Sequence, residues 1–145
     1  MQWLREAEGA LDRARRLLTD RDWVGVCQQA QLCVEYSAKA VIACFEAHQW
    51  THDPSDQLLR VVQANSDAIL SRFGEGMVQR LQGLASDAHE AAPWHGWSTY
   101  GRMESDEHQT FPTDLCTQED AERLLELSER SFLTASQFVL NWLNP

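Results

Sequence analysis

Glu35 and Lys39 are residues whose types and spacing could do chemistry. They are four positions apart in a segment otherwise rich in Ala, Val and Cys, so in a helix they share one face and can form an ion pair. Because polar groups on an apolar helix need partners, we expect Tyr100 and Arg102 to approach this pair in the folded chain. The alternative is a helical ion pair of little energetic consequence.

The histidines offer a second kind of chemistry. His48 and His52 are four residues apart and Asp53 follows, which is metal-ligand spacing if one helix contains them all. Pro54 argues against a continuous helix, and a histidine near a helix C-terminus, favoured by the helix dipole, is the better interpretation. Nothing in the sequence fixes the geometry of the other candidates, which are His89, Glu90, His95 and His108. We therefore expect no metal site and no cofactor.

Aromatic residues gather before the last predicted helix. Trp94, Trp97 and Tyr100 could stack a nucleobase there, although covering the helical bundle is the commoner use of such side chains. The sequence contains no phosphate-binding glycine loop, no nucleophile elbow and no paired-cysteine zinc pattern. Kinases, P-loop enzymes, hydrolases and zinc fingers are therefore unsupported.

Composition sets the scale of the structure that positions these residues. The chain has 145 residues, 43% of them hydrophobic, which suits a single domain over residues 1–145. The net charge of −10 disfavours a broad attraction to nucleic acid or anionic lipid. No uncharged run approaches the ~18 residues of a membrane span, and we expect a cytoplasmic protein without a signal peptide. The four cysteines lack any C-x-x-C spacing, which fits a reduced compartment.

Hydrophobic periodicity predicts an all-α fold. Apolar residues recur at three- and four-residue steps over residues 3–18, from Trp23 to about His48, and from Thr117 to Trp142. A third helix is predicted to begin at Pro54 with Asp53 as its cap, and to be broken at residues 74–76, where two glycines flank Glu75. Residues 93–116 show no periodicity and are predicted to form a long ordered loop. The expected architecture is an antiparallel up-and-down four-helix bundle.

Several short segments occur in a characteristic order along most of the chain. They are W-L-x-x-A-x-x-x-L-x-x-A at residues 3–14, Asp22-Trp23, E-Y-S-A-K-A at residues 35–40, His52-Asp53 before Leu58-Leu59, residues 98–101, Pro112 and T-Q-E-D-A at residues 117–121. Together, by their order and spacing more than by any one of them, they resemble the HEPN (higher eukaryotes and prokaryotes nucleotide-binding) domain family. The resemblance implies a small helical bundle that forms a homodimer, with Glu35, Lys39 and Tyr100 in a polar ligand-binding cleft.

The resemblance also points to Arg102 and His108 as candidate catalytic residues. Catalytic members of the family are metal-independent ribonucleases with an arginine followed four to six residues later by a histidine, and Arg-x5-His fits that spacing. The histidine would move a proton at the ribose 2′-hydroxyl or the leaving oxygen, and the arginine would stabilise the phosphorane. However, many relatives have arginine directly before the tyrosine, where this chain has Thr99, and the intervening acidic residues repel phosphate. The alternative is a solvated arginine and histidine.

Two functions remain open from the sequence. The first is a binding module for RNA or a nucleotide, acting as the partner of a separate small nucleotidyltransferase in a prokaryotic toxin-antitoxin-like pair. This partnership is implied by the resemblance, since the chain has no nucleotidyltransferase motif of its own. The second is a metal-independent endoribonuclease that uses Arg102 and His108. The acidic charge balance and the displaced arginine favour the module. The residues themselves show no nucleotide site.

Overall fold

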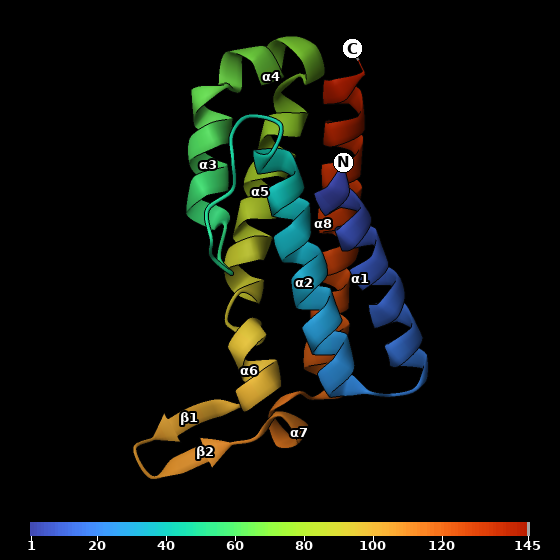
Figure 1. Cartoon of the computed structure of the whole chain (residues 1–145), viewed down its shortest axis with the longest axis vertical. Coiled ribbons are helices and arrows are strands. Elements are labelled where there is room, and N and C mark those ends of the chain that lie inside the picture. The colour runs from blue at the N-terminus through green and yellow to red at the C-terminus, as the bar shows by residue number, and fades with distance from the viewer. Residues whose placement is uncertain (145) are drawn as a thin grey trace.

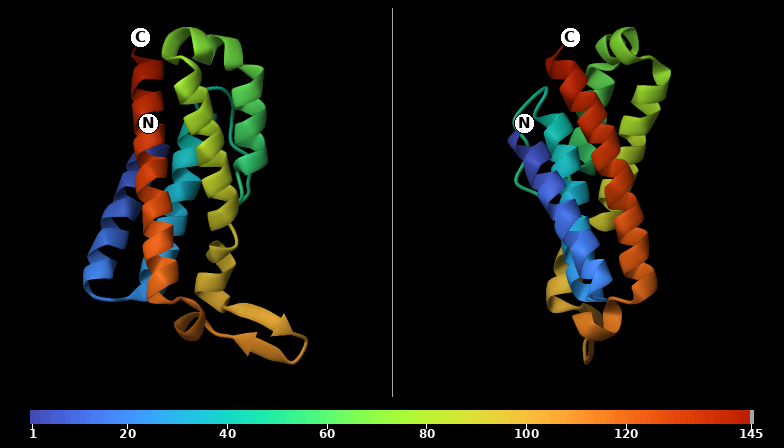
Figure 2. Two further views of the ribbon diagram at one scale, coloured as in Figure 1. Left: turned by 180° about the vertical axis from the view of Figure 1, so that it is seen from behind. Right: turned by 90° about the vertical axis from the view of Figure 1, so that its right-hand side faces the viewer.

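The fold is a bundle of long antiparallel helices, seen in a computed structural model that describes residues 1–144 (Figure 1). The long helices are α1 (Gln2–Thr19), α2 (Trp23–Ile42), α5 (Glu75–Ala91) and α8 (Gln118–Leu143). They alternate in direction, and α2 packs against the other three (Figures 1 and 2). The predicted all-α bundle is confirmed.

The helices form where the sequence places apolar stripes and caps. On α1 the buried residues recur at three- and four-residue steps, so this helix has one apolar face; they are Leu4, Ala7, Ala10, Leu11 and Ala14. At the start of α2 the Asp22 carboxylate accepts a hydrogen bond of 2.9 Å from the Gly25 amide. Thr117 and Asp120 form a capping box at the start of α8. These predicted helix starts are confirmed.

Helix α2 is buried on nearly all sides but is shorter than expected. It ends at Ile42 rather than near His48, because the chain turns at Ala43. The following loop, residues 43–54, runs back along the bundle before α3 (Ser55–Ala64) begins (Figure 1). The helix begins one residue later than expected, so Pro54 and not Asp53 is its N-cap residue. The Asp53 carboxylate still accepts a hydrogen bond of 3.1 Å from the Ser55 amide.

The predicted third helix is not one kinked helix but separate helices that run in different directions. Helix α4 (Ser66–Phe73) crosses one end of the bundle, and α3 and α5 then run side by side in opposite directions (Figure 1). Gly74, between α4 and α5, has φ 80° and ψ 176°, a conformation that other residues rarely adopt. The predicted break at this glycine is confirmed, and the chain reverses over residues 65–74.

Residues 93–116 are not a long loop. They form α6 (Trp94–Tyr100), the antiparallel strands β1 (Arg102–Ser105) and β2 (His108–Thr110), and α7 (Pro112–Leu115). The prediction failed because these elements are short and the hairpin is mostly exposed on both faces, which leaves no hydrophobic period in the sequence. The hairpin extends beyond the end of the bundle (Figure 2).

Within residues 1–144, none of the helices combines the length and the apolar character needed to cross a membrane.

Candidate functional site

The predicted pair on α2 is formed and buried. Lys39 Nζ lies 2.7 Å from Glu35 Oε1, and the two residues are 5% and 3% exposed. The ammonium group also lies 5.3 Å from the centre of the Trp3 ring, within the range of a cation–π contact. Two opposite charges are thus held together inside an otherwise apolar helix face, where neither is solvated by bulk water.

A third polar side chain extends this pair along α2. Gln31 is one helical turn before Glu35 and is 1% exposed. Its Nε2 donates a hydrogen bond of 2.9 Å to Glu35 Oε2, so each oxygen of the carboxylate has its own donor from the same helix. Gln31, Glu35 and Lys39 therefore form a buried polar stripe with a spacing of four residues.

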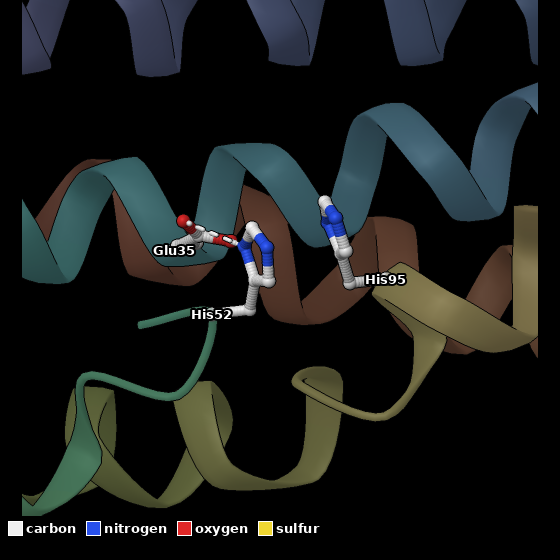
Figure 3. A group of neighbouring side chains, drawn as sticks. All are labelled: Glu35, His52 and His95. Atoms are coloured by element: carbon white, nitrogen blue, oxygen red, sulfur yellow. Dashed lines mark hydrogen bonds and ion pairs between the residues drawn. The ribbon is translucent and has the colours of Figure 1, made fainter. Parts of the chain in front are cut away.

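Two histidines from other segments complete the cluster at the surface. His52 comes from the loop 43–54 and His95 from α6, and both point toward α2 (Figure 3). His52 Nδ1 lies 3.3 Å from Glu35 Oε2 and 3.4 Å from Oε1. The two imidazole rings are stacked, with centroids 3.5 Å apart and an angle of 15° between their planes. We call Gln31, Glu35, Lys39, His52 and His95 the polar cluster.

Hydrogen bonds fix the tautomer of His95. The amide nitrogen of Gln31 donates to Glu35. The amide oxygen of Gln31, Oε1, is therefore the atom that faces His95 Nδ1, at 3.3 Å. This oxygen can only accept, so His95 Nδ1 carries the proton and Nε2 keeps a free lone pair. Burial lowers the pKa of His95, and the neighbouring His52 lowers it further, so the imidazole is neutral at neutral pH.

Contacts around the polar cluster hold its segments in place. Gln28 Nε2 donates a hydrogen bond of 3.0 Å to the carbonyl of Ser98, which ties α6 to α2. Gln57 on α3 accepts from the amide of Gln49 at 2.8 Å and donates to the carbonyl of Ala47 at 2.9 Å, which ties down the loop that carries His52.

A small cavity opens beside the polar cluster, between α2 and α6. Its volume is about 230 Å³. Amide, imidazole, hydroxyl and apolar groups line it, from Gln28, Gln29, Gln31, Leu32, His95, Ser98 and Thr99. The cavity thus offers hydrogen-bond donors and acceptors together with an apolar wall.

Tyr100 and Arg102 do not join Glu35 and Lys39, contrary to our expectation. Tyr100 is 73% exposed, and Arg102 pairs with Glu104 at 3.0 Å and lies over the ring of Trp97. The reason is Gly101, whose φ of 81° turns the chain out of α6 and into the hairpin. The polar cluster takes its outer partners from His52 and His95 instead.

The hairpin does bring Arg102 and His108 to one side. Arg102 pairs with Thr110 across the strands, and His108 is two residues before Thr110, so their side chains face the same way. Glu104 lies on this face as well, because its Oε1 accepts from Arg102 Nε at 3.0 Å and from Thr110 Oγ1 at 3.2 Å. The guanidinium group of Arg102, which would have to bind phosphate in a ribonuclease, is therefore already paired with the carboxylate of Glu104.

Sequence reasoning missed the outer half of the polar cluster. Gln31 could have been found by extending the four-residue spacing of Glu35 and Lys39 by one turn. The sequence suggested His52 only as a metal ligand together with His48 and as part of a family-like segment, and it gave no geometry for His95. His48, considered with His52 as a metal ligand, instead packs edge-on against Trp3, with centroids 4.7 Å apart.

Comparison with known proteins identifies the family. The model of the HEPN domain matches residues 1–136. Searches of curated proteins and of solved structures gave no match. The family match spans nearly all of the helices, including every residue of the polar cluster and the hairpin. The chain therefore belongs to the HEPN domain family.

Proposed function

We propose that this chain is a nucleotide-binding helical module whose ligand enters the cavity between α2 and α6. The observation that carries the proposal is the lining of that cavity. Gln28, Gln29 and His95 supply the donors and acceptors that read the edges of a base, and Leu32 supplies an apolar contact for its face. A volume of about 230 Å³ suits one nucleobase, with the sugar and phosphate remaining outside.

Charge supports a small ligand over a long nucleic acid. The chain carries a net charge of −10, and its single lysine, Lys39, is neutralised by Glu35. Binding that depends on neutralising many phosphates is therefore disfavoured, whereas recognition of a base is not. The ligand class is a mononucleotide or the end of a single-stranded RNA.

Titration with single nucleotides tests the proposal. The four ribonucleoside monophosphates are added to the protein and binding is followed by calorimetry. In Thr99→Trp, an exposed position at the rim of the cavity receives a side chain that fills it, and we expect affinity to fall by at least about tenfold. Thr19→Trp is the matched control, because Thr19 is also exposed and its hydroxyl also donates to the carbonyl four residues earlier. Equal affinity in both variants, or no binding by the unmodified chain, would refute the site.

We also propose that the module acts with a second protein, a separate nucleotidyltransferase, and pairs with its own copy. Both ideas rest on family resemblance. Exposed leucines seven residues apart on α8, Leu133 and Leu140, support the homodimer, because a second copy of the chain could cover these apolar side chains. Light scattering measures the mass of the free chain, and Leu133→Glu should convert a dimer to a monomer. Co-expression with the nucleotidyltransferase of a neighbouring gene tests the other partner.

A second candidate function is metal-independent RNA cleavage by Arg102 and His108. The observation in its favour is that the hairpin places both side chains on one face. Glu104 opposes it by pairing with Arg102. If the chain is a ribonuclease, Arg102→Ala and His108→Ala each lower cleavage in the presence of a chelator by orders of magnitude, and Glu104→Gln raises it. Absence of cleavage by the unmodified chain would remove this candidate.

A further inference from the structure

Three side chains of the polar cluster carry donor atoms that metals prefer. Glu35, His52 and His95 each offer one such atom, and these atoms all lie within 4.8 Å of one another (Figure 3). The three residues come from α2, the loop 43–54 and α6, so the tertiary fold and not local sequence brings them together. Within residues 1–144 they are the one group of His, Cys, Asp and Glu side chains with this property.

We propose that Glu35, His52 and His95 bind a divalent transition metal ion such as zinc, with water completing its coordination. Two imidazoles and one carboxylate are a donor set that suits zinc and its first-row neighbours, and not calcium or magnesium, which prefer oxygen. The proposal does not rest on nucleotide binding. It departs from the expectation of no metal site, because the sequence does not show that the loop 43–54 and α6 meet.

The separation between His52 and Glu35 fits two ligands of one ion. Charge-assisted N–H···O bonds usually span about 2.7–2.9 Å. His52 Nδ1 lies 3.3 Å from Glu35 Oε2. Two atoms that are each about 2.0–2.1 Å from a tetrahedral zinc ion are separated by about 3.3–3.4 Å. The distance is thus longer than a strong ion pair favours and equals the spacing across a shared ion.

The surrounding polar groups orient the ligands as second-sphere groups do at metal sites. Lys39 donates to Glu35 Oε1 at 2.7 Å and Gln31 donates to Oε2 at 2.9 Å, so the carboxylate is held in place with Oε2 at 3.3 Å from His52 Nδ1. Gln31 accepts the Nδ1 proton of His95, which keeps Nε2 of that ring free for an ion. His52 has 59% of its side chain exposed, so its ring can tilt to accommodate an ion while Nδ1 stays beside Glu35 Oε2.

The positive charge of Lys39 should lower the affinity of the proposed site for zinc, and this effect can be tested. This charge lies one carboxylate away from the proposed ion, and like charges in a buried site repel. Lys39→Met removes that charge and should therefore tighten zinc binding, measured at a temperature where circular dichroism shows that this less stable variant is folded. Adventitious binding to surface histidines would not respond in this way, because it does not involve Glu35.

The experiment uses the tag-free full chain with zinc chloride in calorimetry and cobalt chloride in visible spectroscopy. Both histidines are partly exposed, so His52→Ala and His95→Ala should fold, and each should lower zinc affinity by at least about tenfold. His48→Gln, in the same loop but outside the cluster, should bind as the unmodified chain does. The visible spectrum of the cobalt-bound chain should indicate nitrogen and oxygen ligands and should lack a thiolate charge-transfer band.

Three results would overturn the proposal. They are a lack of zinc binding by the unmodified chain, equal affinity in His52→Ala, His95→Ala and His48→Gln, and a thiolate band in the cobalt spectrum. Tighter binding by Lys39→Met together with loss in both alanine variants supports it.

Discussion

Replacing Lys39 by methionine should strongly destabilise the protein. The substitution removes the positive charge 2.7 Å from Glu35 Oε1 and leaves a carboxylate that is 3% exposed. Glu35 keeps the hydrogen bond from Gln31 at 2.9 Å and the longer contact with His52. Breaking one side of a buried ion pair costs about 3–5 kcal/mol, because the remaining charge is left without its partner. That is a large part of the ~5–15 kcal/mol that stabilises a typical domain.

The double variant Glu35→Gln/Lys39→Met separates the pair from the packing around it. Each single variant leaves one buried charge, whereas the double variant leaves none and keeps an acceptor for Gln31. We therefore expect the double variant to be more stable than either single variant, which additive effects would not produce. The free energy of unfolding is measured by urea denaturation, followed by far-ultraviolet circular dichroism.

An exposed ion pair provides the control. Arg123 makes two hydrogen bonds of 3.0 Å to Glu90, but both side chains are about half exposed. Arg123→Ala should cost less than about 1 kcal/mol, because solvent screens the pair. Two results would show that burial does not determine the energy of the Glu35–Lys39 pair. One is a loss of unfolding free energy in Lys39→Met that is no larger than in Arg123→Ala. The other is a loss in the double variant equal to the sum of the losses in Glu35→Gln and Lys39→Met.

The remaining predictions concern two glycines and a buried thiol. Gly101→Ala should destabilise the protein more than Gly74→Ala. Both positions need positive φ, which costs about 1–3 kcal/mol, but a Cβ at residue 101 would also clash with the carbonyl oxygen of Thr110, whereas a Cβ at residue 74 would meet no other atom. Urea denaturation compares the two variants, and equal costs would exclude the clash. Burial raises the pKa of the Cys33 thiol to about 12 from its ordinary value of 9.0. Its contribution to stability is complete below pH 9.0 and is lost as the pH rises toward 12, by about 1.4 kcal/mol per pH unit. Cys33→Ala should reduce this alkaline slope, and an unchanged slope would contradict the assignment.

Local patterns predicted the helices well because the information for a helix is local. The stripe on α1 and the caps at Asp22 and Thr117 each involve residues within a few positions of one another. The reversal between α3 and α5 is different. A glycine at residue 74 signals a break, but whether the next helix continues or turns back depends on which surfaces the two helices bury against each other.

The difference between local and tertiary information also explains which residues of the polar cluster could be predicted from the sequence. Glu35 and Lys39 could be paired from the sequence because four residues is one helical turn. Tyr100 and Arg102 were wrongly placed beside them, since the direction of the chain after α6 depends on the backbone angles of Gly101. His52 could not be placed at all without knowing that α2 ends at Ile42 and that the next loop turns back along it.

The distribution of burial within the polar cluster favours a binding site over a structural role. Gln31, Glu35 and Lys39 are at most 5% exposed, and burying such groups is unfavourable compared with apolar residues of similar size. A stable bundle does not require them. Their hydrogen bonds instead orient His52 and His95, which lie at the surface and can reach a ligand. If the role were only structural, the double variant Glu35→Gln/Lys39→Met would lose stability and keep its affinity for zinc. We expect it to keep most of its stability and to lose affinity for zinc, because an amide is a far weaker metal ligand than a carboxylate.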